Sequence, residues 1–109
     1  MTRRGPRALL PILLGAGLVH GPAATAEVTI IQKNRAFSVR LVALRVGESI
    51  TFVNSDNVRH NLLSETKGAE MDITQPPGSS DTVRFSQPGT VLVECTIHPD
   101  MRLEVLVRQ

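Results

Sequence analysis

This sequence contains a single cysteine, Cys95, among its 109 residues. One thiol excludes an internal disulfide, although small exported domains with weak cores commonly depend on them. It also excludes a c-type haem site, which requires two cysteines shortly before a histidine. A lone thiol in an oxidising compartment is a liability unless it is buried or occupied by a metal. We therefore expect Cys95 to be either a small core residue or a metal ligand.

Tryptophan and tyrosine are absent, and the aromatic residues are limited to Phe37, Phe52 and Phe85. The sequence has no run of lysine and arginine with interleaved aromatic residues, which argues against a nucleic-acid surface. The formal charge of +2 depends on three arginines within the first seven residues. Beyond residue 26 there are 9 basic and 10 acidic residues, so we expect no nucleic-acid partner.

Long apolar runs are also missing, apart from residues 8–19. That run is too short, and too interrupted by Pro11 and glycines, for a good membrane span. It follows a basic start and precedes Ala24-Thr25-Ala26, a combination typical of a secretory signal peptide. We predict a signal peptide over residues 1–26 and one exported or periplasmic domain over residues 27–109, with no membrane span after cleavage. The alternative is an uncleaved N-terminal anchor.

From residue 27 onward, short runs rich in Val, Ile, Thr and Phe alternate with Gly, Pro, Asn and Asp, and no window carries a long helical apolar stripe. One strand is expected within 37–46, with Phe37, Val39 and Leu41 on one face. Residues 65–80 are expected to form an extended loop with at most a short helical turn near 69–72. The other expected strands are 28–31, 49–53, 61–64, 82–85, 90–95 and 103–107. About seven short strands without a crossover helix predict an all-β Greek-key β-sandwich.

Near the C-terminus, Cys95, His98 and Met101 follow one another at three-residue intervals. Thiolate and thioether are soft donors that suit copper, and imidazole binds both of its common oxidation states. Blue-copper electron-transfer centres combine two histidines and a cysteine with a weak axial methionine. The other histidine beyond the predicted signal peptide is His60, in the polar loop 54–61. We therefore hypothesise that these four side chains bind one copper ion.

Other chemistries fit less well. Zinc is a poorer match, because thioether is a poor zinc ligand and structural zinc sites usually contain two or more cysteines. Nucleophilic catalysis by Cys95 with a histidine would explain neither Met101 nor the compact spacing. Taken singly, Met101 is more typical of a core residue and His60 of a surface residue, so the combination carries the hypothesis. The spare methionine, Met71, is assigned to packing or to the surroundings of the site.

Two motifs carry a family resemblance. Asn54, with His60-Asn61 six residues on, and the segment Cys95-Thr96-Ile97-His98-Pro99-Asp100-Met101-Arg102 together resemble the cupredoxins, the small blue copper proteins. The two-residue gap between the cysteine and the histidine, followed by proline, is most similar to the amicyanin branch of this plastocyanin-like group. The resemblance covers nearly all of residues 37–107.

The resemblance implies a β-sandwich with one type 1 copper ion. The implied ligands are three equatorial residues and one weak axial residue, in this order: His60, Cys95, His98 and Met101. It further implies that Asn54 hydrogen-bonds to the 95–96 segment, that Asn61 supports the loop beside the metal and that the edge of His98 is the electron port.

The leading functional expectation is an exported electron carrier that docks transiently on redox partners, either a dehydrogenase or a cytochrome. The amicyanin resemblance suggests an amine dehydrogenase as donor. We expect a monomer without enzyme activity, because four protein ligands leave no open position for substrate. One alternative is a copper-binding or copper-delivery protein that holds Cu(I) without passing electrons, although such proteins tend to cluster Met and His. Another alternative is a metal-free sandwich that serves as an adhesive or assembly module.

Overall fold

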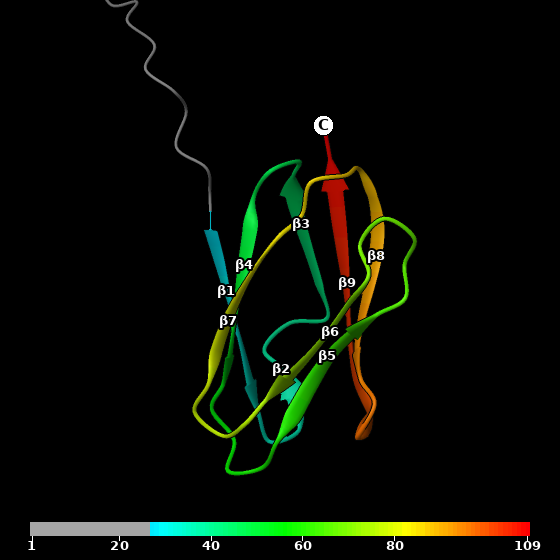
Figure 1. The fold of residues 1–109 in the computed structure, drawn as a ribbon. Helices are drawn as coiled ribbons and strands as arrows, with labels where there is room; N and C mark the ends of the chain where they lie inside the picture. The colour runs from blue at the N-terminus through cyan, green and yellow to red at the C-terminus, as the bar shows by residue number, and fades with distance from the viewer. Residues whose placement is uncertain (1–26) are drawn as a thin grey trace, which may run out of the picture.

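The computed structural model describes residues 27–109, and these form two sheets that face each other (Figure 1). The predicted β-sandwich is confirmed, with nine strands in place of about seven and no helix among the described residues. Within this range there is accordingly no helix that is long and apolar enough to cross a membrane. The predicted signal peptide lies outside the described residues.

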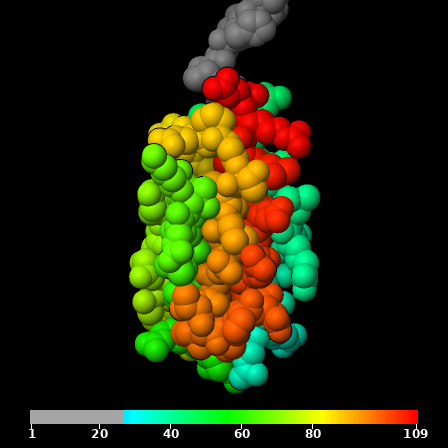
Figure 2. Space-filling model, turned by 90° about the vertical axis from the view of Figure 1, so that its right-hand side faces the viewer, coloured from blue at the N-terminus to red at the C-terminus, as the bar shows by residue number. Residues whose placement is uncertain are grey.

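The four-stranded sheet has the order β2-β1-β4-β7, and the five-stranded sheet has the order β3-β9-β8-β5-β6. The strands of the first sheet are β1 (Glu27–Lys33), β2 (Ala36–Phe37), β4 (Ser49–Asn54) and β7 (Ser80–Arg84). The strands of the second are β3 (Leu41–Arg45), β5 (His60–Ser64), β6 (Met71–Gln75), β8 (Gly89–Cys95) and β9 (His98–Arg108). Figure 2 views the five-stranded sheet from outside, with β8 and β9 side by side.

Two strand pairs are parallel, β1 with β4 and β3 with β9, while the remaining pairs are antiparallel. Parallel neighbours cannot be joined by a tight hairpin, so the chain passes from one sheet to the other between them. The result is the crossing connectivity expected of a Greek-key sandwich.

Alternating apolar side chains fill the space between the two sheets. Ile50 and Phe52 on β4 are fully buried, and β8 buries Val91, Val93 and Cys95 as predicted. On β9 every second residue from Met101 to Val107 is buried, which confirms the predicted alternation of that strand. This period of two is what a strand with one face in the core requires.

The prediction of a single strand within 37–46 is wrong. Residues 38–40 leave the four-stranded sheet and enter the five-stranded one, so the segment forms the separate strands β2 and β3. The change of sheet also changes the face on which each side chain lies. Phe37 is buried, whereas Val39 and Leu41 are 42% and 55% exposed, so these three residues do not share one face.

The prediction of an extended loop over 65–80 is also wrong, because β6 lies within it. This strand pairs along its whole length with β5, from Ser64 opposite Met71 to His60 opposite Gln75. Its backbone hydrogen bonds come from the neighbouring strand, so local sequence preference does not reveal it. Met71 is partly buried against the core, as assigned.

Three connections meet at the end of the sandwich opposite the C-terminus (Figure 1). They are the β1–β2 turn, the β4–β5 loop and the β8–β9 turn. Hydrogen bonds join the first to the second, and the side chains of His60 and His98 meet where the second and the third end. The predicted metal ligands lie at this end.

Candidate metal centre

The β8–β9 turn places Cys95 opposite His98. The two residues pair across the turn, whereas the next pair joins Glu94 to Arg102. The two pairs are adjacent on β8 but four residues apart on β9, so residues 99–101 form a bulge. A bulge re-aims side chains at the end of a strand, and here it separates His98 from the regular alternation of β9.

The second histidine enters from the β4–β5 loop. His60 is the first residue of β5 and is fully buried. The loop before it is fixed by Asn54, also fully buried, whose Nδ2 group donates to the carbonyl oxygens of Val58 and Gln75 at 2.9 Å each. The Asn54 Oδ1 atom accepts the backbone N–H of Asp56 at 3.0 Å. A buried amide with every group bonded leaves the loop little freedom.

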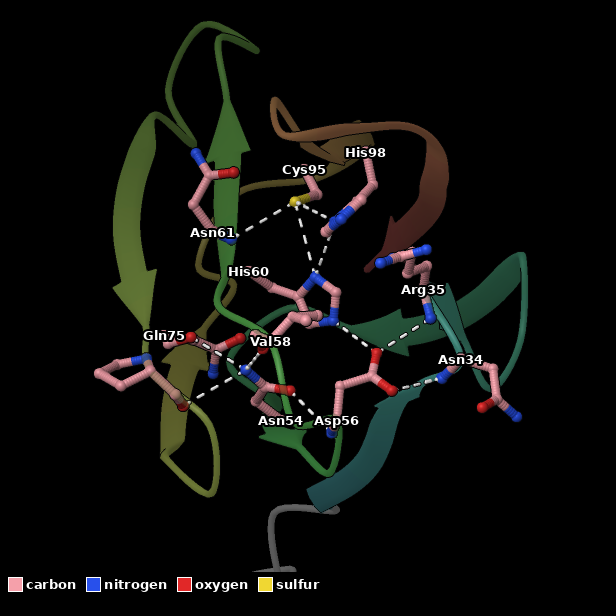
Figure 3. A network of polar contacts seen from close by, with 11 residues as sticks. Asn34, Arg35, Asn54, Asp56, Val58, His60, Asn61, Gln75, Cys95 and His98 are labelled. Atoms are coloured by element: carbon pink, nitrogen blue, oxygen red, sulfur yellow. Dashed lines mark hydrogen bonds and ion pairs between the residues drawn. The ribbon is translucent and has the colours of Figure 1, made fainter.

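Three donor atoms converge between these segments, as Figure 3 shows. The Nδ1 atoms of His60 and His98 are 3.1 Å apart, and they lie 3.9 and 3.8 Å from the Cys95 Sγ atom. These separations put a point about 2.1 Å from all three atoms, close to metal–imidazole bonds of about 2.0–2.1 Å and metal–thiolate bonds of about 2.3 Å. Two nitrogens and one soft sulfur therefore fit one transition-metal ion.

The tautomer of His60 leaves its Nδ1 atom able to bind a metal ion. Its Nε2 atom lies 2.6 Å from Asp56 Oδ2, and an ionised carboxylate only accepts hydrogen bonds. The proton therefore sits on Nε2, and Nδ1 presents a lone pair to His98 and Cys95. Burial raises the pKa of Asp56, but hydrogen bonds from the Arg35 N–H, from His60 and from the Asn34 N–H outweigh it, so the pKa lies below its ordinary value.

His98 is the more accessible of the two histidines and is only half-buried. Burial is the main cause that lowers its pKa below the ordinary value, followed by repulsion from the charge that His60 would carry if protonated and from the Arg35 guanidinium. A lowered pKa favours the neutral imidazole, which is the form that binds metals. The neighbouring Ile97 is 48% exposed, so an apolar side chain adjoins this histidine at the surface. In Figure 2 this turn is the orange region at the lower end of the molecule.

The predicted hydrogen-bond partner of Asn54 is wrong. Its hydrogen bonds go to the loops around residues 56–58 and 75–76, and none among the described residues reaches the 95–96 segment. Asn61 makes that link: its Oδ1 atom accepts the Thr96 N–H at 2.8 Å, and its own N–H points to Cys95 Sγ at 3.5 Å. The predicted support from Asn61 is therefore confirmed.

Met101 lies at the end of the bulge and is 1% exposed. It belongs to the same buried cluster as Cys95. The structure thus brings three predicted ligands together and buries the fourth in the core cluster that contains Cys95, while their roles as ligands remain predictions.

Sequence reasoning missed Asp56 and the turn formed by Asn34 and Arg35. Asp56 accepts the backbone N–H groups of these two residues at 2.6 and 2.9 Å. The spacing of Asp56 four residues before His60 was visible in the sequence. Its contact with a turn more than twenty residues earlier depends on the packing of the two connections and left no local signal.

The comparisons with known proteins agree with this geometry. The family described as copper binding proteins, plastocyanin/azurin family, matches residues 24–108. Amicyanin-alpha of Methylorubrum extorquens is 32% identical over 92 residues, which cover 81% of this chain and 76% of that protein. The methylamine utilization protein MauL of the same organism is 31% identical over 85 residues, which cover 76% of this chain and 75% of that protein.

Solved structures share the fold at lower identity. A purple cupredoxin from Nitrosopumilus maritimus has a TM-score of 0.64 and 22% identity, over 73% of this chain and 98% of that chain. An amicyanin variant in its Cu(I) form has a TM-score of 0.65 and 22% identity, over 79% of this chain and 86% of that chain. Both are similar to this protein in architecture.

Proposed function

This chain belongs to the plastocyanin/azurin family of copper binding proteins, the cupredoxins, and we propose that it is an exported electron carrier. The observation that carries the proposal is the convergence of two Nδ1 atoms and one Sγ atom within 3.9 Å of one another. This donor set is the one that blue-copper electron-transfer centres use. When bound, copper alternates between Cu(II) and Cu(I), which is the one-electron chemistry of such a site.

The four predicted ligands have distinct tasks. His60 and His98 would bind the copper through their Nδ1 atoms and Cys95 would bind it through its thiolate, while Met101 would be a fourth, weaker ligand through its thioether. The buried loop before His60 resists movement, because Asn54 bonds to backbone groups of two connections. Small structural change between oxidation states favours fast electron transfer. Because these four ligands would fill the copper shell and leave no position for a substrate, we propose that the protein is not an enzyme.

The β8–β9 turn is the proposed docking surface. His98 is half-buried, and Ile97 and Pro99 beside it are exposed. A small apolar surface around a ligand edge suits brief encounters with redox partners, since such complexes have small interfaces. Two relatives bear the names amicyanin-alpha and methylamine utilization protein. We therefore propose an amine-oxidising dehydrogenase as donor and a cytochrome as acceptor.

Export completes the proposal. Residues 1–26 act as a signal peptide, and residues 27–109 work as a monomer in the periplasm or outside the cell. Mass spectrometry of the protein secreted by a bacterial host tests this assignment. A mass that corresponds to a start at Glu27 is expected, whereas an intact N-terminus in a membrane fraction would favour an anchor.

The electron-carrier proposal is tested by adding one equivalent of Cu(II) to the purified protein. We expect intense visible absorption, narrow copper hyperfine splitting and a reversible one-electron wave in voltammetry. Tight Cu(I) binding without a stable Cu(II) form would instead favour copper delivery. A protein that binds neither oxidation state would overturn the proposal.

A further inference from the structure

The β1–β2 turn contains an unusual backbone conformation at its two central residues. Asn34 and Arg35 have φ angles of 55° and 56°, in the left-handed region. They form a two-residue hairpin loop, since Lys33 pairs with Ala36. Positive φ at both central positions is the pattern of a type I′ turn, which accepts asparagine readily. Arginine is far less common there, so Arg35 holds this conformation at a cost in free energy.

The conformation turns both backbone N–H groups toward one carboxylate (Figure 3). Asn34 N donates to Asp56 Oδ1 at 2.6 Å, and Arg35 N donates to Asp56 Oδ2 at 2.9 Å. The Asp56 side chain is only 10% exposed. Its ionised form is therefore stabilised by these backbone donors, because little water reaches it.

The same carboxylate oxygen that faces Arg35 also accepts the Nε2–H of His60 at 2.6 Å. His60 is fully buried, so no water can replace this bond. A continuous chain of hydrogen bonds thus runs from the surface turn through Asp56 to the imidazole. Its far end is the Nδ1 atom that faces Cys95 and His98.

We infer that the Asn34–Arg35 turn is a positioning element for the metal site, acting through Asp56 on His60. The inference rests on the proposed function. The two backbone donors hold the carboxylate, and the carboxylate fixes the tautomer and the ring orientation of the histidine. The negative charge of Asp56 beside the Nε2 atom also makes Nδ1 a stronger donor, which favours Cu(II) over Cu(I).

The first test replaces the carboxylate. Asp56→Asn preserves size but removes the charge, and we expect a loss of Cu(II) affinity of about 10–100-fold. With Cu(I) affinity little changed, the reduction potential rises by about 59 mV for each tenfold loss. The matched control is Asp72→Asn, which removes one exposed carboxylate from β6. Equal potentials and Cu(II) affinities for Asp56→Asn and the parent would overturn the inference.

The second test separates the turn from the charge of Arg35. Arg35→Asn and Arg35→Val both remove the guanidinium and keep the backbone N–H. Asparagine tolerates positive φ, whereas β-branched valine does not. We expect Arg35→Val to shift the reduction potential in the same direction as Asp56→Asn does. We expect Arg35→Asn to differ from Arg35→Val by retaining the parental copper hyperfine splitting. Identical behaviour of the two variants would contradict a role for the turn geometry.

The third test uses the metal-free protein. The Nε2 proton of His60 should give a downfield NMR signal that exchanges slowly with solvent, because it is buried and bonded to a carboxylate. Asp56→Asn should weaken that protection at least tenfold, and Arg35→Val should do so while Arg35→Asn does not. Rapid exchange in the parent protein would overturn the inference whatever the copper result. A parent that shows slow exchange but binds no copper would instead contradict the proposed function.

Discussion

The β4–β5 loop and the β8–β9 turn each deliver one histidine to the same point, yet they are held in different ways. His60 is fully buried, and the loop before it is bonded through Asn54 and Asp56 to two other segments, the β1–β2 turn and the end of β6. His98, the first residue of β9 after the turn, is half-buried with exposed residues on both sides. The main tie of that turn to another strand is the bond from Thr96 N to Asn61.

This difference teaches how one small site can be rigid and accessible together. The loop side provides fixed geometry because its polar groups are buried and bonded. The turn side provides contact with solvent and partners because its residues are exposed. Cys95 belongs to both sides: it pairs with His98 and lies in the buried core.

Cys95→Ser should have the largest effect, because it removes the soft donor that the two sides share. We expect complete loss of the intense visible absorption and a copper hyperfine splitting typical of ordinary Cu(II). Burial of a hydroxyl costs about 1–3 kcal/mol in the metal-free protein, which thermal unfolding will measure. Retention of the blue colour in this variant would exclude thiolate coordination.

His98→Gly and His60→Gly test the two sides against each other. Removing either imidazole should abolish the parental spectrum. Added imidazole should restore it in His98→Gly at low concentration, because that position opens to solvent. In His60→Gly much higher concentrations should be needed, because the position is fully buried. Absorption during an imidazole titration measures the rescue. Equal rescue of both variants would contradict the proposed difference in solvent access between the two histidine positions.

Asn54→Ala and Asn61→Ala sharpen the same comparison through stability. Loss of the Asn54 amide leaves buried carbonyl oxygens without a donor, so we expect about 2–3 kcal/mol lower free energy of unfolding. Loss of the Asn61 acceptor should cost about 0.5–1.5 kcal/mol, because the exposed Thr96 N–H can bond to water. Urea unfolding of both metal-free variants provides the measurement. A larger loss in Asn61→Ala would reverse the assignment of the rigid side.

Met101→Leu should have the smallest effect on folding and a selective effect on the site. The change conserves volume, so the free energy of unfolding should fall by less than about 1.5 kcal/mol. Loss of a weak axial donor should raise the reduction potential. Met71→Leu is the control, since Met71 packs against the core from β6. The axial assignment is untenable if both variants keep the parental potential.

The strands were predictable wherever their own sequence alternates. Residues 90–95 and 103–107 show that alternation, and the structure buries the expected side of each. The strand β6 and the split between β2 and β3 were not predictable, because both depend on which neighbouring strand supplies hydrogen bonds. Pairing between distant segments is a tertiary property that short windows do not contain.

The convergence of donor atoms at the site could be predicted from the chemistry of the ligand side chains rather than from the assignment of strands. Thiol, imidazole and thioether at short intervals suit one metal, and the structure brings Cys95, His98 and His60 together. The supporting contacts were harder to predict. The link to the cysteine segment comes from Asn61 rather than Asn54, and Asp56 bonds to a turn far away in sequence. Such contacts involve common polar residues, whose partners are decided by packing.

A crystal structure of the copper-loaded protein would test the central claim most directly. We predict one copper ion about 2.0–2.3 Å from the Nδ1 atoms of His60 and His98 and the Sγ atom of Cys95. The His60 Nε2–H should still donate to Asp56, and the loop before His60 should keep its position. Copper bound elsewhere, or through the Nε2 atom of His60 with Asp56 displaced, would contradict the account.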